Sequence, residues 1–361
     1  SVSTTLKRVG LEQAFHYLYK DPEKNVRHIM DWADKFANGE FERQRATIRA
    51  AIEDPEHPYH DYILHVVNDV DPEVMKTMAA NFFLNANLIG WDRQESYRKQ
   101  YNCNIPWAIL LDPTSACNLH CTGCWAAEYG NKLNLSFDEI DGIIRQGKEL
   151  GIYMYIYTGG EPLVRKKDLI RLCEKHDDCI FLCFTNATLI DEEFCQEMLR
   201  VGNFFVPISV EGFEEANDGR RGRGHFQKAL DAMDLLRSHR IPFGVSICYT
   251  SRNYKVVTSD EFLDLLISKG CVFAWYFHYM PVGLNADTSL LLTPEQRTYM
   301  KDRVREIRGV TGGKELYCIA SISATLYGVM EAFSFTPMPS CRRARIFSVT
   351  RPNMGRPHRR S

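Results

Sequence analysis

The stretch Asp112-Pro-Thr-Ser-Ala-Cys-Asn-Leu-His-Cys-Thr-Gly-Cys-Trp125 carries three cysteines, Cys117, Cys121 and Cys124, in a C-x3-C-x2-C spacing. One short loop with this spacing can bring three sulfur atoms to a single metal centre. A structural zinc site normally uses four protein ligands, and an ordinary electron-transfer iron–sulfur cluster uses four cysteines. Three ligands leave one position open, so the stretch predicts an iron–sulfur cluster with one iron atom reserved for a bound molecule.

The composition is that of a globular protein without membrane spans. The chain has 361 residues, of which 45% are hydrophobic and 25% charged, and its formal net charge is -2. This length allows one large domain, or one large and one small. The near-neutral charge gives no reason to expect a nucleic acid as partner. No apolar run approaches the ~20 residues that cross a bilayer, and the N-terminus lacks a signal-peptide pattern.

The cysteine content predicts a reducing compartment. The chain contains 12 cysteines, but it is far longer than the small secreted domains that disulfides stabilise. Free thiols and exposed clusters are damaged by oxidation, so we expect a cytoplasmic protein. Most cysteines outside the C-x3-C-x2-C stretch lie in apolar runs, where we expect them to pack as small hydrophobic residues. Cys318 and Cys341 are too few for an auxiliary cluster domain.

Residues 1–102 have the pattern of a helical region. Asp21-Pro22, Asp54-Pro55 and Asp71-Pro72 each place a capping aspartate before a proline at the first helical position. Apolar residues at helical spacing follow the first and the third of these pairs. We interpret these apolar faces as packed against the main domain, which is the usual role of an amphipathic helix. A docking or membrane-surface helix, or a lid over an active site, is the alternative.

Residues 103–308 alternate between apolar runs of strand length and amphipathic helices. The predicted strands are 107–111, 152–157, 180–184, 204–210, 243–249 and 272–279. This alternation predicts right-handed βαβ units and a parallel sheet. Six such units predict an α/β fold, a partial (β/α)6 TIM-like barrel that follows the helical N-terminal region. In such barrels the functional groups lie at the C-terminal ends of the strands, and the three-cysteine loop follows the first strand.

Two glycines and a carboxylate follow the second predicted strand, in the sequence Thr158-Gly159-Gly160-Glu161-Pro162. Glycine lets the backbone come close to a ligand, and a carboxylate beside it can hold a cationic amine. A Gly-Gly-Glu-Pro sequence is usually only a turn. Its place directly after a strand, downstream of the cysteine loop, favours a binding site instead.

The C-x3-C-x2-C loop and the GGEP sequence together resemble the radical S-adenosylmethionine (radical SAM) superfamily, and SPASM-type and hopanoid-type (adenosyltransferase) members in particular. The resemblance implies that the three cysteines hold a [4Fe-4S] cluster and that S-adenosyl-L-methionine (SAM) binds at its open iron. It assigns the contact with the methionine amino group to Gly159, Gly160 and Glu161.

The resemblance also assigns SAM contacts to later strand ends. The segment from Thr185 to Thr188 resembles the family's T-N-G-T segment, and Ser209-Val-Glu-Gly resembles its S-x-D-G segment near the ribose, with glutamate in place of aspartate. A D-x-x-R-G match places an arginine on the SAM carboxylate, although a solvated loop is the alternative for Arg220, Arg221 and Arg223. The backbone after the sixth strand is expected to flank the adenine. The implied contacts are Thr185, Asn186, Ser209, Glu211, Arg221 and Met280.

One position departs from the family's pattern. Many members carry an aromatic residue directly before the last cluster cysteine, where it packs against adenine. This chain has Gly123 there, and Trp125 follows the cysteine. Compensation by Trp125 and simple packing of Trp125 under the loop both remain open. Some members, including the hopanoid-forming type, resemble this C-x-G-C form.

Two other features need an interpretation. His278 lies among aromatic residues, where we expect a core histidine, with a substrate contact or proton donor as the alternative. Residues 309–361 lose the strand–helix alternation, and from Val310 onward they contain two acidic and eight basic residues. We interpret this segment as truncated or frame-shifted, replacing a genuine C-terminal domain. A basic tail for nucleic acid or anionic lipid is the alternative.

The resemblance implies reductive cleavage of SAM to a 5′-deoxyadenosyl radical that abstracts a substrate hydrogen. It implies a low-potential electron donor, flavodoxin or ferredoxin. Two substrate classes remain open, a ribosomally made peptide and a lipid or isoprenoid small molecule. The non-enzyme alternative is an iron–sulfur binding protein without catalysis. It gives no reason for GGEP, T-N-A-T and S-V-E-G to follow successive strands.

Overall fold

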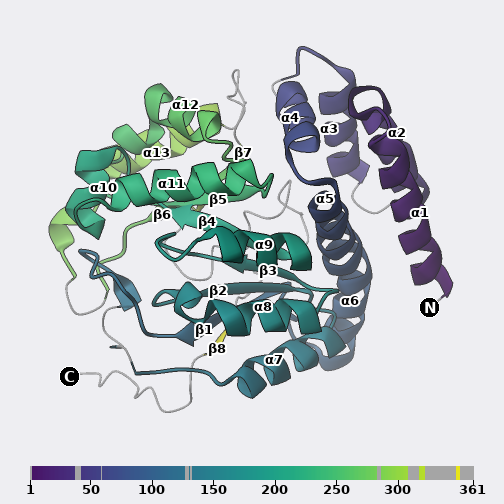
Figure 1. The fold of residues 1–361 in the computed structure, drawn as a ribbon, viewed down its shortest axis with the longest axis horizontal. Coiled ribbons are helices and arrows are strands. Elements are labelled where there is room, and N and C mark those ends of the chain that lie inside the picture. Colours follow the sequence, from purple (N-terminus) through teal and green to yellow (C-terminus); the bar gives the residue numbers. More distant parts are fainter. Residues whose placement is uncertain are drawn as a thin grey trace.

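The computed structural model describes residues 2–36, 42–57, 59–126, 130, 132–282, 286–307, 317–321 and 347–349. A helical N-terminal region precedes a curved parallel sheet with helices along its outer face (Figure 1). No helix within these ranges combines the length and the apolar character that crossing a membrane would require. The predicted α/β fold, with its helical N-terminal region, is confirmed.

The described residues of the N-terminal region form seven helical elements. They are α1 (Val2–Leu18), α2 (Pro22–Phe36), α3 (Glu42–Glu53), α4 (His60–Asp69), α5 (Pro72–Met78), the π-helix η1 (Ala79–Ile89) and α6 (Gly90–Tyr101). Two of the three Asp-Pro pairs start a helix as predicted, and the Asp71 side chain accepts hydrogen bonds from the backbone of Glu73 and Val74. The prediction for Asp54-Pro55 is wrong. Asp54 follows α3 and accepts a hydrogen bond from the Glu56 amide in a turn.

All six predicted strands form and pair in parallel. They are β1 (Ala108–Thr114), β2 (Met154–Gly159), β3 (Ile180–Cys183), β4 (Phe204–Ser209), β5 (Phe243–Tyr249) and β6 (Phe273–His278). Two further strands, β7 (Tyr317–Ser321) and β8 (Phe347–Val349), extend the sheet at its edges in the order β7-β6-β5-β4-β3-β2-β1-β8. Sequence analysis did not predict them in the C-terminal segment. The rest of our interpretation of residues 309–361 lies outside the described residues.

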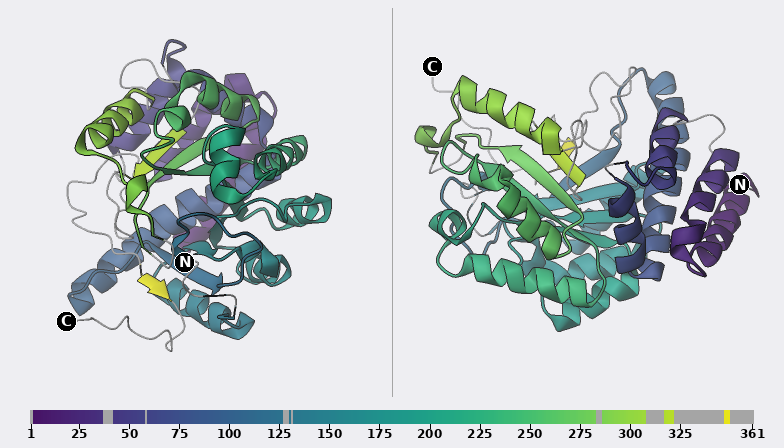
Figure 2. Two further views of the ribbon diagram at one scale, coloured as in Figure 1. Left: turned by 90° about the vertical axis from the view of Figure 1, so that its left-hand side faces the viewer. Right: turned by 90° about the horizontal axis from the view of Figure 1, so that it is seen from above.

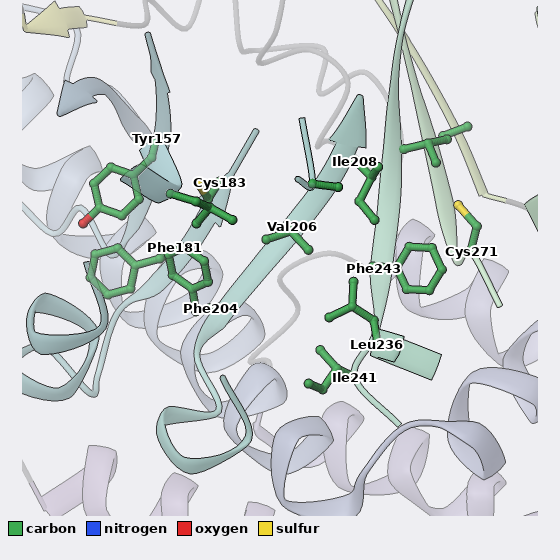
Figure 3. Packing of buried hydrophobic residues seen from close by; sticks show 14 of the residues in the cluster. Tyr157, Phe181, Cys183, Phe204, Val206, Ile208, Leu236, Ile241, Phe243 and Cys271 are labelled. Carbon is green, nitrogen blue, oxygen red and sulfur yellow. The ribbon is translucent and has the colours of Figure 1, made fainter. Parts of the chain in front are cut away.

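Helices and apolar side chains cover the outer face of the sheet. The helices are α7 (Phe137–Glu149), α8 (Lys166–Lys175), α9 (Glu192–Val201), α10 (Glu214–Arg221), α11 (His225–Ser238), α12 (Asp260–Ser268) and α13 (Pro294–Arg305). Figure 3 shows part of this layer, in which Phe181 lies beside Tyr157 and Phe204, and Phe243 lies near Leu236 and Ile241. The cysteines of this layer, Cys173, Cys179, Cys183, Cys195 and Cys271, are buried free thiols, as the packing interpretation predicted.

The inner face of the sheet packs against the N-terminal helices (Figure 2). Alternate strand residues such as Leu110, Ile156 and Trp275 are buried in one cluster with Val74 and Leu84 of α5 and η1. The apolar faces of these helices are therefore used inside the molecule.

Hydrogen bonds show which end of the barrel the N-terminal region closes. The Asn81 and Gln94 side-chain amides donate to the carbonyls of Cys179 and Gly151, both at 2.8 Å, and the Tyr62 hydroxyl donates to the Val272 carbonyl at 2.9 Å. These three carbonyls immediately precede β3, β2 and β6. The elements α4 to α6 therefore cover the N-terminal ends of the strands, opposite the cysteine loop, which confirms the packing interpretation and contradicts a lid role for them.

Candidate functional site

The three-cysteine loop connects β1 to α7 at the C-terminal edge of the sheet. Cys117, Cys121 and Cys124 are half-buried free thiols. The loop is tied to the end of α10, because the Thr122 amide donates to the Arg220 carbonyl at 2.9 Å. Within the described ranges, no three Cys, His, Asp or Glu side chains already stand as a complete metal-binding group.

Burial and nearby cations act on these thiols in opposite directions. Burial raises the pKa of Cys117 to about 11 and also raises the pKa of Cys121. The guanidinium groups of Arg221 and Arg220 counteract the rise at Cys121, and Arg221 Nη1 lies 3.9 Å from Cys121 Sγ. A bound metal deprotonates its thiol ligands, and the two arginines add positive charge beside the resulting thiolates. The donor set and its surroundings therefore fit an iron–sulfur cluster.

The GGEP sequence lies directly against the cysteine loop. The Gly160 amide donates to the Thr114 carbonyl at 2.9 Å, and the Glu161 amide donates to the Ala116 carbonyl at 2.8 Å. A Cβ atom at Gly160 would lie only 2.2 Å from the Ala116 oxygen, and one at Gly159, where φ is +103°, would lie 2.7 Å from the Thr114 oxygen. Both positions thus require glycine because two backbone segments cross there.

Glu161 links the second strand end to the third. Its side chain is 1% exposed, and its carboxylate accepts hydrogen bonds from Thr185 Oγ1 at 2.8 Å, the Asn186 amide at 2.7 Å and the Leu163 amide at 3.0 Å. Burial raises the pKa of Glu161, and these hydrogen bonds oppose the rise. A carboxylate has about four acceptor positions, so three serve the fold and one is left for the predicted amine contact.

Asn118 is a site residue that sequence analysis missed. Its Oδ1 accepts from Asn186 Nδ2 at 2.9 Å, and its Nδ2 donates to Thr188 Oγ1 at 2.8 Å. These bonds fasten the residue after Cys117 to the T-N-A-T segment. No spacing pattern connects positions 118 and 186, so only its place next to a ligand cysteine was a signal.

Glu211 is paired with two arginines beneath the loop. Its side chain is 0% exposed, one oxygen accepts from both Arg220 and Arg221, and the other accepts from the Cys248 amide at 3.2 Å. Arg220 Nε also donates to the Thr122 carbonyl at 3.2 Å. The solvated-loop interpretation is therefore wrong for Arg220 and Arg221. The contacts predicted for Glu211 with ribose and for Arg221 with the SAM carboxylate stay predictions.

The remaining predicted residues, Ser209, Met280 and His278, differ in burial and in their contacts. Ser209 is half-buried at the end of β4, and its amide donates to the Thr185 carbonyl at 2.9 Å. Met280 is 39% exposed just after β6. His278 packs beside the Tyr249 ring on the outer side of the sheet, and burial lowers the pKa of its imidazole. Because His278 is only half-buried, the core interpretation of this histidine stays a prediction.

Asp112, at the end of β1, has an unsatisfied carboxylate oxygen. Its Oδ1 is buried and has no hydrogen-bond partner among the residues that the structure describes. Burial raises the pKa of Asp112 to about 6. The carboxylate touches the place of Gly159, where an added Cβ would lie 3.1 Å from the Asp112 Cβ. A buried polar atom without a partner commonly marks a functional site, and this one lies beside GGEP.

We expect Asp112→Asn to stabilise the cluster-free protein at neutral pH. The folded-state pKa of Asp112 lies above its unfolded value, so the folded state holds this proton to higher pH, and stability falls as the pH rises from about 4 to about 6. A shift of this size corresponds to about 3 kcal/mol at pH 7.5, a gain that should largely disappear by pH 4. Urea unfolding of both proteins at the two pH values measures it. An equal gain at both would contradict a titration effect.

The sequence profile of the radical SAM superfamily matches residues 111–266, which run from β1 into α12. An Fe-coproporphyrin III synthase of Methanosarcina barkeri is 25% identical over 272 residues, which cover 72% of this chain and 66% of that protein. A PqqA peptide cyclase of Bradyrhizobium diazoefficiens is 30% identical over 218 residues, which cover 55% of this chain and 57% of that protein. The chain thus spans about half to two thirds of the length of these curated relatives.

A solved structure shares the fold. The crystal structure of Streptococcus suis SuiB bound to precursor peptide SuiA has a TM-score of 0.53 and 18% identity, over 64% of this chain and 53% of that chain. The structural likeness covers a larger share of the chain than the family match over residues 111–266 does. Residues 111–266, which begin within β1 and include the three-cysteine loop and GGEP at the C-terminal edge of the sheet, thus match the radical SAM superfamily.

Proposed function

We propose that this chain is an enzyme that uses a [4Fe-4S] cluster on Cys117, Cys121 and Cys124 to cleave SAM reductively. In this superfamily the cluster and SAM together supply a 5′-deoxyadenosyl radical, which takes a hydrogen atom from the substrate. The observation that supports the proposal is the hydrogen-bonded contact of three strand ends. GGEP bonds to the cysteine loop through Gly160 and Glu161, and Glu161 bonds to the T-N-A-T segment.

The chain's own residues have defined tasks in this proposal. Glycine at positions 159 and 160 keeps the GGEP backbone within hydrogen-bonding distance of the cysteine loop, and Glu161 fixes its place relative to Asn186. The backbone at Gly159 and Gly160 and the remaining acceptor position of Glu161 orient the amino group of SAM. The arginines under the loop add positive charge beside the thiolates. The N-terminal helices close the opposite end of the barrel and keep water out.

For the substrate, we favour a peptide. The PqqA peptide cyclase is 30% identical to this chain, and its name states peptide chemistry. An iron porphyrin is the second candidate, because the Fe-coproporphyrin III synthase covers 72% of this chain. The lipid or isoprenoid alternative loses one of its two supports, because the apolar N-terminal helices that favoured it are buried against the inner face of the sheet. The likeness of the C-x-G-C form around Gly123 to hopanoid-type members still favours it.

The electron donor approaches most directly at the cysteine loop. Asn118, His120 and Thr122 are exposed, while the cysteines between them are half-buried. The loop therefore has a surface edge one residue away from each of its first two cysteines. A small low-potential protein such as flavodoxin or ferredoxin fits the need for a single electron at this edge.

Anaerobic reconstitution with iron and sulfide, followed by dithionite and SAM, tests the proposal. We expect the wild-type protein to release 5′-deoxyadenosine, detected by chromatography. The precursor peptides PqqA and SuiA, and iron coproporphyrin III, added separately, test the two substrate classes, and the correct class should raise the rate. A protein that binds four irons yet never cleaves SAM, with or without these additions, would support the non-catalytic alternative.

A further inference from the structure

The absence of a side chain at Gly123 lets the Tyr279 ring pack directly against the backbone of the cysteine loop. The Gly123 backbone has φ of +68°, and the residue is buried. A Cβ atom at this position would lie 2.8 Å from Cε2 of Tyr279 and 3.0 Å from its hydroxyl oxygen. Carbon atoms do not approach so closely without displacement. The loop between Cys121 and Cys124 therefore rests on the Tyr279 ring, and any side chain at position 123 would displace it.

The Tyr279 ring is held from both ends. Tyr279 follows β6 directly and continues the alternation that places Trp275 on the inner face of the sheet. Its amide donates to the Tyr249 carbonyl at 3.1 Å, and its hydroxyl accepts from the Asp287 amide at 3.0 Å. The side chain is 1% exposed, so it packs under the loop and offers little surface to a ligand.

We propose that Tyr279 is a positioning residue that sets the arrangement of Cys121 and Cys124. The proposal rests on the proposed function, in which these cysteines hold a cluster. A glycine with positive φ gives the loop no rigidity of its own, whereas metal ligands must be held to within about 0.5 Å. The ring supplies this rigidity from β6. Many family members carry an aromatic residue at the position of Gly123. In this chain an aromatic ring from a residue about 155 positions later packs against that position instead.

The proposal also joins the cluster loop to the segment after β6. The Asp287 amide bonds to the Tyr279 hydroxyl, and Met280 is the neighbour of Tyr279. A displacement of this segment would therefore move the Tyr279 ring, and with it the backbone at Gly123. Tyr279→Phe removes only the hydrogen bond and keeps the ring, so it separates the contribution of the hydrogen bond from that of ring packing.

Four variants test the contact, namely Tyr279→Leu, Tyr279→Phe, Gly123→Ala and the double variant Gly123→Ala/Tyr279→Leu. The first readout is the rate at which a thiol reagent labels Cys121 and Cys124 in the reduced, cluster-free protein, relative to exposed Cys103. We expect Tyr279→Leu and Gly123→Ala each to change this ratio about threefold or more, and Tyr279→Phe to leave it near the wild-type value. The double variant should show less than the sum, because the clash partner is gone.

The second readout is the electron paramagnetic resonance (EPR) spectrum of the dithionite-reduced cluster, together with the iron retained after reconstitution. A ring that sets ligand positions should broaden or shift the signal when removed, whereas a merely structural residue would not. Tyr299→Leu, which removes an exposed ring from α13, is the matched control and should match the wild type in both readouts.

Two results would overturn the proposal. One is additive labelling in the double variant, and the other is a wild-type EPR spectrum for Tyr279→Leu. The labelling arm needs no cluster, so it tests the Gly123–Tyr279 contact even if the wild type binds no iron. Failure of the wild type to form a cluster would instead contradict the proposed function.

Discussion

Replacing Cys117, Cys121 or Cys124 with serine is expected to abolish stable cluster binding and bring SAM cleavage down to background. Serine keeps the size of the side chain, but its hydroxyl does not ionise as a thiol does when iron binds. Because the loop provides three ligands, each loss leaves two, and bound iron should fall from about four per chain to below about one. Iron and sulfide analysis and the 5′-deoxyadenosine assay measure the two effects.

Two other cysteines supply controls for this prediction. Cys103 is exposed and Cys195 is buried in the outer core, and neither lies on the cysteine loop. Their serine variants should retain wild-type iron, with a loss of stability only for Cys195→Ser, where a hydroxyl enters an apolar site. If Cys103→Ser lost its iron while one of the three loop variants kept it, the ligand assignment would be wrong.

The ligand loop and the sheet could be predicted because both depend on local sequence. Three cysteines within one loop can be recognised without knowledge of the fold. The apolar run at 152–157 predicts a buried strand, and Tyr155 and Tyr157 of β2 are both fully buried. The same holds for Asp71, because a capping aspartate before proline acts within one turn of helix. GGEP could be predicted as part of the site only because it follows a strand directly, downstream of the cysteine loop.

Contacts between distant segments could not be predicted. The hydrogen bonds between Asn118 and Asn186 and the packing of Gly123 on the Tyr279 ring form only when segments far apart in sequence meet at one edge of the barrel. A polar residue in a loop has the same pattern whether it faces water or a buried partner. Arg220 and Arg221 illustrate this, since their sequence fits a solvated loop and the structure pairs both with a buried carboxylate.

At Glu211 this chain has glutamate where the family pattern has aspartate, and the buried ion pair of this residue has a large expected effect on stability. Glu211→Ala is expected to lower stability by about 3–4 kcal/mol, because removing one partner of a buried ion pair leaves the other charges uncompensated. The Glu211 side chain is 0% exposed, while those of Arg220 and Arg221 are 16% and 12% exposed. In a chain of this size, each kcal/mol lowers the melting temperature by about 2 °C, so calorimetry of the cluster-free protein should show a fall of about 6–8 °C.

Glu215, on the same helix as the arginines but exposed, is the control, and Glu215→Ala should change stability by less than about 0.5 kcal/mol.

Glu211→Asp is the sharper test, because aspartate is the residue of the family's S-x-D-G pattern. One methylene fewer shortens the reach by about 1.5 Å, so aspartate cannot keep the bonds to both guanidinium groups and the bond to the Cys248 amide together. We therefore expect an intermediate loss of stability. Because Arg220 also bonds to the Thr122 carbonyl, the cluster loop should loosen in step with that loss. A Glu211→Asp protein as stable as the wild type would mean that the arginines do not need the longer side chain, and that the carboxylate at this position is free to serve a ligand.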